Sequence, residues 1–398
     1  MNDIFKNIQG DKTLWAVLIL LAGFSFLPVY SAASNLAYHS DSGNTFIYLL
    51  KHFIHLSLGF TFIYLVLKIP YNYFKGISIL MIPIVIILLL YTLLQTPLAH
   101  SLSNANRWIE IPIVGFTFQP STLAGLILMI YVSRYLSKTK SEEVVFSQSI
   151  LPLWIPTLLI LILILPANFS TTAIIFCMVI LLCFIAGYPG KYLFGILISA
   201  ALVLLIFILT IKAYPGIFPN RVDTWNNRIE NFWNKENTAK NYQIEKAKIA
   251  IASGGFKGLG PGKSIQKNFL PQSSSDFIFA IIIEEYGLLG GLFLLSTYTL
   301  FLFRIIIIST KAKTVFGSLL VIGLGIPIVF QALINIGVSI ELFPITGQPL
   351  PLISSGGTSI WMTCIAIGII QGVRIGSEIK IDKNREENNR LEILKETT

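Results

Sequence analysis

Long runs of apolar residues recur along most of the chain and are separated by short polar segments. Runs of about 20 apolar residues have the length that an α-helix needs to cross a hydrocarbon layer about 30 Å thick. We therefore predict ten membrane-spanning helices from this pattern. Their expected ranges are 14–34, 45–69, 76–97, 121–137, 149–167, 170–187, 192–212, 276–303, 315–337 and 358–376.

Composition narrows the class of protein. Hydrophobic residues make up 54% of the 398 residues and charged residues only 12%, with a mean hydropathy of +0.73. These values exclude a water-soluble fold and a disordered chain. The three cysteines, Cys177, Cys183 and Cys364, lie in apolar runs without CxxC spacing, which argues against a disulfide framework or a thiolate metal site.

Lysine and arginine in the connecting segments predict the orientation. With a cytoplasmic N-terminus, the inner segments hold 17 Lys and Arg, and the short outer loops hold Arg107 alone. We therefore expect an all-α polytopic membrane protein with ten transmembrane helices, both termini in the cytoplasm and a large extracytoplasmic loop between the seventh and eighth helices. The segments are a cytoplasmic N-terminus (1–13), helices one to seven (14–212), the extracytoplasmic basic loop (213–275), helices eight to ten (276–376) and a cytoplasmic tail (377–398).

The extracytoplasmic loop carries most of the positive charge. Counted from Lys212, it has ten Lys and Arg against four acids, or +6 of the net +9. Such a surface suits a lipid phosphate or a pyrophosphate, although simple contact with anionic headgroups explains it as well. The spacing of Trp225, Ile229, Phe232 and Trp233 predicts an interfacial helix.

A second helix is expected over residues 239–253 of the same loop, and it ends in GGFKGLGPG. Glycines let backbone amides approach a ligand closely. A flexible turn without a ligand explains the same glycines, and the sequence leaves both interpretations open.

Three carboxylates belong to the eighth span. Asp276 opens it, and Glu284 and Glu285 lie two to three turns deeper. Carboxylates inside membrane helices are costly, so each is a functional candidate. Asp276 could instead cap the helix, and pairing of the two glutamates with an arginine or with backbone groups of a neighbouring helix is the expected role for them.

An irregular stretch, ELFPITGQPLPLISSGGTS, precedes the last span. Its prolines and glycines forbid a regular helix, so this backbone must be buried in protein or line a wet cavity. Gln331 and Asn335, four residues apart on the ninth span, place two amides on one face below it. Hydrogen bonding between helices is an equally ordinary role for them.

The run GLGPGKSIQKNFLPQSSSDFIFAIIIEEYGLLGG, the stretch FPITGQPLPLISSGGTS and the earlier NRWIE and FQPS motifs together resemble the SEDS family of peptidoglycan glycosyltransferases. The resemblance covers nearly the whole chain. The segments TWNNRI and TGQPLP are more similar to the division branch, FtsW, than to the elongation branch, RodA.

The resemblance implies a processive polymerase that acts on lipid II and releases undecaprenyl pyrophosphate. The family's catalytic aspartate lies in the DFIF motif, which makes Asp276 the expected general base or metal-assisted carboxylate. Cations would stabilise the leaving pyrophosphate, with Arg107, Lys248, Lys263 and Lys267 or a divalent ion (Mg or Mn) as candidates.

The substrate-binding residues expected from the resemblance and the local patterns are Arg107, Trp108, Gln119, Ser121, Lys248, Lys263, Gln266, Lys267, Gln331, Asn335, Thr346, Ser354, Ser355, Gly356, Gly357 and Thr358. The chain departs from the family's pattern at several positions, among them Ser355, where an aromatic is common. After FQPS the family usually has Glu and, three residues on, Lys, whereas this chain has Thr122 and Gly125. A buried ion pair and one candidate phosphate contact are therefore missing.

The implied partners are lipid II, undecaprenyl pyrophosphate, a class B penicillin-binding protein (a transpeptidase), other divisome membrane proteins and membrane lipid, with no nucleic acid. The implied location is the inner (plasma) membrane. Two other functions stay open. The chain could be a flippase for lipid-linked precursors, whose site would lie near the bilayer midplane, or a division scaffold that recruits a transpeptidase.

Overall fold

The computed structural model describes residues 9–39, 44–94, 107–111, 116–139, 145–213, 242–270 and 273–396. Most of them form helices. The longer helices are α2 (Lys12–His39), α3 (Thr45–Leu67), α4 (Phe74–Leu94), α5 (Pro120–Thr139), α7 (Ile155–Ile164), α8 (Phe169–Ile185), α9 (Gly190–Ala213), α11 (Tyr242–Gly254), α12 (Ile278–Lys311), α13 (Val315–Ser339) and α14 (Gly357–Glu396). The short elements are η1 (Tyr71–Tyr73), β1 (Ile109–Ile111), β2 (Phe116–Phe118), α6 (Phe146–Ser149), η2 (Ile150–Trp154) and η3 (Gln266–Asn268).

Each of the ten predicted spans coincides with a helical segment. Eight of the described helical segments are long and apolar enough to cross a membrane, and α8 is a shorter apolar helix. The polytopic helical membrane fold is therefore confirmed, while the count of ten stays a prediction. The helix predicted at 239–253 is α11, and the interfacial helix predicted around Trp225 lies outside the described residues.

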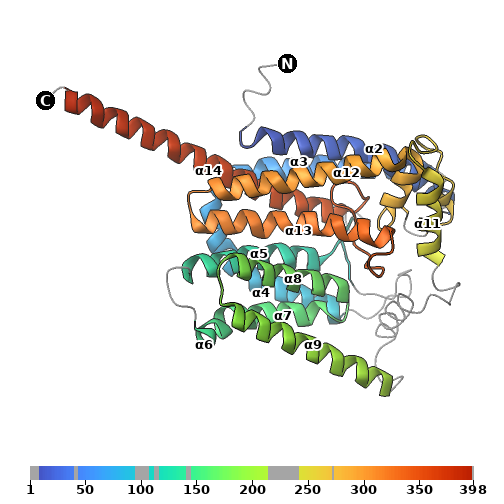
Figure 1. Ribbon diagram of the computed structural model, residues 1–398, viewed down its shortest axis with the longest axis horizontal. Helices are drawn as coiled ribbons and strands as arrows, with labels where there is room; N and C mark the ends of the chain where they lie inside the picture. The colour runs from blue at the N-terminus through green and yellow to red at the C-terminus, as the bar shows by residue number, and fades with distance from the viewer. Residues whose placement is uncertain are drawn as a thin grey trace.

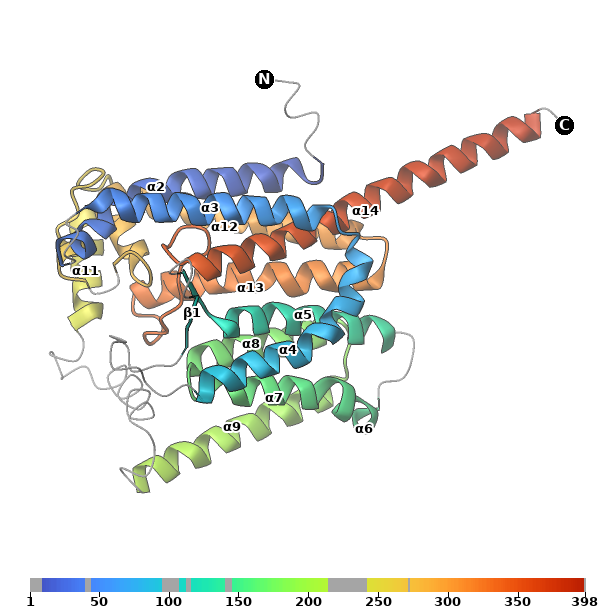
Figure 2. The same ribbon diagram turned by 180° about the vertical axis from the view of Figure 1, so that it is seen from behind.

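Successive long helices run in alternate directions and lie side by side in one bundle (Figures 1 and 2). The helix α11 lies at one end of the bundle. The start of α2 and the end of α14 lie toward the opposite end, and α14 continues beyond the bundle. We call the end that carries α11 the α11 end, and the candidate site is found there.

Small residues let the central helices approach one another closely. A Cβ atom added at Gly59 of α3 would lie 2.7 Å from the sulfur of Cys364 on α14. One added at Gly368 of α14 would lie 3.1 Å from Val66 of α3. Close backbone packing through small residues is typical of helices in membranes. This contact fixes the start of α14 next to α3.

Asp11 anchors the first helix at the end opposite to the α11 end. Its carboxylate accepts a hydrogen bond from the backbone N–H of Leu14 at 2.9 Å and forms an ion pair with Arg304 of α12. Its backbone N–H donates to Oε1 of Gln371 on α14 at 2.6 Å. Three helices are therefore joined by one buried carboxylate and one buried amide.

Candidate active site

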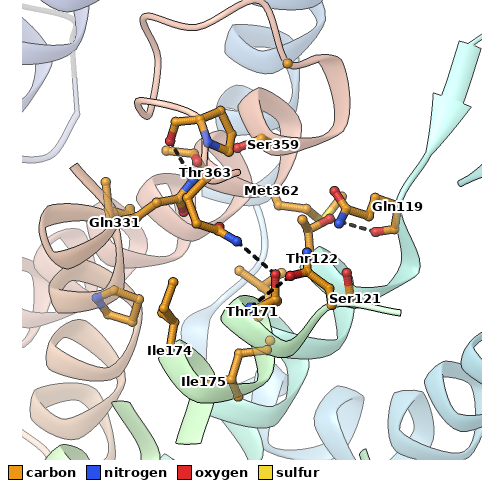
Figure 3. Close-up of a pocket in the computed structure, with 18 of the residues that line it drawn as sticks. Gln119, Ser121, Thr122, Thr171, Ile174, Ile175, Gln331, Ser359, Met362 and Thr363 are labelled. Atoms are coloured by element: carbon orange, nitrogen blue, oxygen red, sulfur yellow. Dashed lines mark hydrogen bonds between the residues drawn. The ribbon is translucent and has the colours of Figure 1, made fainter. Parts of the chain in front are cut away.

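A cavity of about 370 Å³ lies at the α11 end of the bundle. Four helices begin around it, namely α5, α8, α12 and α14. Its polar wall consists of residues from the first turns of these helices, from the segments that lead into them and, in the case of Gln331, from α13. They include Arg107, Gln119, Ser121, Thr122, Asn168, Thr171, Ser275, Asp276, Gln331, Gln348, Ser355 and Ser359. Figure 3 shows Thr122, Thr171, Gln331 and Ser359 grouped around this space.

The cavity becomes apolar with depth. Along α8 its lining extends from Asn168 to Met178, and along α5 from Gln119 to Met129. At a rise of 1.5 Å per residue, both helices give a depth of about 15 Å, close to half the thickness of a bilayer core. Met129, Met178 and Met362 line the cavity together with leucine and isoleucine side chains.

The replacements noted in the sequence face this cavity. Thr122 and Gly125 both line it, at the positions where the resembled family has an acid and a base. Arg107 and Asp276 are the charged side chains among its described lining residues. A charged ligand in the cavity therefore faces two charged side chains, Arg107 and Asp276. Its other polar contacts come from hydroxyls, amides and helix ends.

Asp276 is half-buried and lies just before α12. Phe277 occupies the N-cap position of α12, so Asp276 precedes the cap. The neighbouring wall is Gly347, where an added Cβ would lie 3.4 Å from Oδ2 of Asp276 and where φ is +68°. The positive φ and the close carboxylate favour glycine at that position. The side chain of Asp276 is therefore held at the wall of the cavity.

The predicted irregular stretch between α13 and α14 forms the wall next to Asp276, and hydrogen bonds attach it to the segment before α12. Ser354 Oγ donates to the Ser275 carbonyl at 2.6 Å, and Ser355 Oγ donates to the Ser274 carbonyl at 3.1 Å. Gln331 Nε2 donates to the Pro349 carbonyl at 2.8 Å. The expectation that this backbone lines a cavity is confirmed, and side chains satisfy its polar groups.

Asn335 supports this wall from behind. It is buried, and its Nδ2 donates to the carbonyls of both Asp276 and Gln348 at 2.8 Å. The amides predicted on one face of α13 therefore hold the loop and the aspartate segment together, and Gln331 also faces the cavity.

Four helix N-termini directed toward one cavity create a positive potential. Each carries the equivalent of about half a positive charge, and its first N–H groups lack partners within the helix. Arg107 adds a full charge at the same cavity. This combination is suited to a phosphate or diphosphate group.

Glu284 and Glu285 lie outside this cavity and are fully buried. Glu284 accepts hydrogen bonds from the backbone N–H groups of Ile265 and Gln266 at 3.0 and 3.2 Å and from the Ser264 hydroxyl. Glu285 accepts from the hydroxyl of Ser31 on α2. The partners of Glu284 thus belong to the loop before α12, and the predicted pairing with an arginine or with a neighbouring helix is wrong for it.

The glycine-rich loop packs on a break in α12. At Gly287 the helix has φ +68° and ψ −167°. This break leaves backbone carbonyls that precede Gly287 without hydrogen-bond partners within the helix. The N–H groups of Leu259 and Gly260 donate to the carbonyls of Glu284 and Glu285, both at 2.9 Å. The glycines allow the loop backbone to approach another group closely, but that group is the backbone of α12 and not a ligand.

The predicted lysine sites lie away from the cavity. Lys248 forms an ion pair with Glu341, and Lys263 is exposed. Lys267 Nζ contacts the Ser31 hydroxyl at 3.1 Å and the Gly262 carbonyl at 2.8 Å. The structure therefore does not bring these candidates, or Gln266, to the wall that Asp276 shares with Arg107.

The remaining predicted residues divide into two groups. Arg107, Trp108, Gln119, Ser121, Gln331, Ser355 and Gly356 line the cavity with Asp276. Asn335, Thr346, Ser354, Gly357 and Thr358 lie behind it or beside it. An added Cβ at Gly357 would lie 2.6 Å from the ring of His55, so this glycine packs against α3.

Asn168, Thr171 and Gln348 also line the cavity and were not among the predicted site residues. Asn168 is the N-cap of α8, and its side chain accepts from the Thr171 N–H at 3.2 Å. An asparagine after a proline and before an apolar run is a recognised helix start, and it could have indicated this corner of the site.

The chain matches the family profile described as cell cycle protein, FtsW/RodA/SpoVE, over residues 11–378. A probable peptidoglycan glycosyltransferase FtsW from Marinomonas mediterranea is 30% identical, over 95% of this chain and 93% of the relative. The protein of the same name from Buchnera aphidicola subsp. Baizongia pistaciae is 33% identical, over 94% of this chain and 95% of the relative.

Solved structures share the fold. A chain of a peptidoglycan synthase complex that coordinates polymerization and crosslinking superposes with a TM-score of 0.73 at 20% identity, over 92% of this chain and 98% of that one. The rod shape determining protein RodA of Thermus thermophilus gives a TM-score of 0.66 at 20% identity, over 93% and 98%. Because the family profile and relatives at 30% identity or more cover nearly its whole length, the chain belongs to the FtsW/RodA/SpoVE family of cell cycle proteins.

Proposed function

We propose that this protein is a peptidoglycan glycosyltransferase that polymerises lipid II into glycan strands during septal synthesis. The relatives of 30% identity or more bear the name of this activity. The observation that carries the proposal is a half-buried carboxylate, Asp276, on the wall of a cavity that also holds Arg107 and four helix N-termini. A group that takes up a proton and groups that stabilise a departing anion are thereby placed together.

The reaction needs few protein groups. The 4-hydroxyl oxygen of an acceptor N-acetylglucosamine forms a bond to the anomeric carbon of the donor sugar, and the bond from that carbon to the diphosphate oxygen breaks. Asp276 accepts the hydroxyl proton. The bonding pair leaves with undecaprenyl diphosphate, whose charge Arg107 and the helix N-termini stabilise. Serine and threonine hydroxyls of the cavity wall, such as Ser121 and Ser359, would bind the sugars.

The donor set at Asp276 fits a loosely held divalent ion. No group of three His, Cys, Asp or Glu side chains suited to a metal occurs among the described residues. One carboxylate together with substrate phosphate oxygens and water is a common environment for Mg²⁺. When bound, such an ion neutralises charge on the diphosphate, and the proton transfer to Asp276 does not depend on it.

We propose that both termini are cytoplasmic in the inner membrane and that the α11 end faces outward. The start of α2 and the end of α14 lie toward the same end of the bundle, as an even number of spans requires (Figure 1). A class B penicillin-binding protein is the proposed partner. A structural neighbour with a TM-score of 0.73 belongs to a complex that coordinates polymerization and crosslinking, which supports this choice.

The flippase alternative loses part of its basis. It drew on intramembrane carboxylates as candidate transport groups, but Glu284 accepts hydrogen bonds from the loop before α12 and Glu285 from Ser31. Groups that serve as permanent acceptors are poorly placed to bind and release a transported substrate. The polymerase is the function that the cavity supports best.

The direct test is a lipid II polymerisation assay on the purified chain, with and without a co-expressed transpeptidase. We expect glycan strands from the wild type. We expect a loss of about 10²- to 10⁴-fold in Asp276→Asn, because a general base contributes that much. Retained expression and partner binding of the variant are the control. Equal polymer from both proteins would contradict the proposal.

A further inference from the structure

A hydrogen bond crosses the mouth of the cavity. Gln348, in the segment between α13 and α14, donates from Nε2 to the hydroxyl of Thr171 at 2.9 Å. Figure 3 shows this bond reaching the labelled Thr171 on α8, across from Gln331 on α13. Both partners line the cavity, and Thr171 is the third residue of α8. The bond therefore joins two walls at the level where α8 begins.

The segment that contains Gln348 also lies against the Asp276 segment. Asn335 Nδ2 donates at 2.8 Å to the carbonyl of Gln348 and also to the carbonyl of Asp276. Gly347 packs against the carboxylate itself, since a Cβ there would lie 3.4 Å from Oδ2. A shift of the segment 347–349 would therefore move the wall against which the carboxylate rests.

Two further side-chain hydrogen bonds to this segment come from α13. Gln331 binds the Pro349 carbonyl and Asn335 binds the Gln348 carbonyl, and both belong to α13. The bond to Thr171 attaches the segment to α8 instead. Below it lie Ile174 and Ile175, which offer no other polar side-chain partner. Loss of this bond would remove the side-chain attachment of Gln348 to α8 and leave the contacts to α13 in place.

We propose that Gln348 and Thr171 form a positioning pair for the polymerase reaction, which holds segment 347–349 and thereby the Asp276 carboxylate at its working distance from the acceptor hydroxyl. This inference rests on the proposed function and deepens it. Both residues act through Asp276. Displacement of a catalytic group by a fraction of an ångström lowers turnover more than substrate binding, because the transition state depends most on alignment.

A double-mutant cycle tests the pair. Gln348→Leu and Thr171→Val each remove one partner while keeping a similar shape. We expect each to lower kcat about 10-fold with KM changed less than about 2-fold. The double variant should be no slower than either single variant, because the interaction is already lost. Thr171→Ser keeps the hydroxyl and should restore most of the turnover.

Thr299→Val is the matched control. Thr299 is exposed on α12, and its hydroxyl donates to the Leu295 carbonyl of the same helix at 2.7 Å, so this change should leave turnover unchanged. Turnover is normalised to the folded fraction measured by thermal unfolding. Effects that multiply in the double variant, or effects on KM alone, would overturn the inference, because they indicate separate contacts with substrate.

Different results would overturn the proposed function and the positioning pair. Equal polymer formation by wild type and Asp276→Asn would overturn the proposed function and the positioning pair together. An active wild type with an inactive Asp276→Asn, combined with independent effects of Gln348→Leu and Thr171→Val, would overturn the positioning pair alone.

Discussion

Two acidic regions of the same helix differ in what surrounds them. Asp276, just before α12, lines a cavity of about 370 Å³ with Arg107 and the starts of three other helices. Glu284 and Glu285, two turns further on, are fully buried and accept hydrogen bonds from the loop before α12 and from α2. Three carboxylates of one predicted span therefore lie in two different environments.

The difference shows how an acid within a membrane protein should be interpreted. Burial of a carboxylate is costly, so such residues are retained either for chemistry or because partners compensate for the burial. Glu284 has its partners in place and stabilises the junction between the loop before α12 and the broken helix. Asp276 faces a space large enough for a ligand. Substitutions in the two regions should consequently affect different measurements.

The largest effect is expected at the junction. In Gly258→Val the new Cβ would lie 2.2 Å from the Glu285 carbonyl oxygen, and φ at this position is +78°. Because backbone atoms cannot move aside, we expect a loss of more than about 4 kcal/mol and little folded protein. Thermal unfolding in detergent measures this. Gly262→Asn is the control, since φ is +76° there but nothing lies within 4 Å of the added atom. Equal midpoints for the two variants would contradict the packing.

Glu284→Ala should destabilise the protein without removing chemistry. The Ser264 hydroxyl and the N–H groups of Ile265 and Gln266 would lose their acceptor, which we expect to cost about 3 kcal/mol. Glu284→Gln keeps one acceptor oxygen and should lose less. Polymer formed per folded molecule should stay near that of the wild type, and a specific loss of turnover in a fully folded variant would refute the structural role.

Arg107→Ala should weaken the cavity's hold on the diphosphate. A charge-assisted hydrogen bond contributes about 1.5–3 kcal/mol, so we expect kcat/KM to fall about 10- to 100-fold. Arg107→Lys should be intermediate, because lysine keeps the charge but not the planar fork. Arg374→Ala, which removes an ion pair with Glu378 in the middle of α14 and outside the cavity lining, is the matched control. The prediction fails if both alanine variants behave alike.

Lys263→Ala should have the smallest effect. This side chain is exposed on the loop before α12 and does not belong to the cavity wall. We expect kcat/KM to change less than about 2-fold. A decrease as large as that of Arg107→Ala would show that the loop reaches the diphosphate during the reaction.

The sequence predicted the elements well where one physical signal dominates. Apolar length placed the spans within a few residues of α3 and α13, and the density of proline and glycine correctly marked the irregular stretch before α14. Asp276 was predicted as the catalytic carboxylate from two signals together. These are its position at the start of a helix and the resemblance to the SEDS family.

Residues that depend on contacts between distant segments were harder to predict. Thr171 and Gln348 meet although they are 177 residues apart, and no local pattern connects them. The break at Gly287 could not be predicted either, because it depends on the glycine loop that supplies its missing hydrogen bonds. Lys267 was a reasonable diphosphate ligand by charge, but Ser31 and the Gly262 carbonyl bind its amine.

The most direct measurement compares lipid II turnover per folded molecule in Asp276→Asn and Glu284→Gln, prepared with the same partner and normalised by thermal unfolding. We expect Asp276→Asn to unfold like the wild type and to polymerise about 10²- to 10⁴-fold more slowly, whereas Glu284→Gln should unfold at a lower temperature and polymerise normally. A folded Asp276→Asn that polymerises like the wild type, or a folded Glu284→Gln that does not, would contradict these expectations.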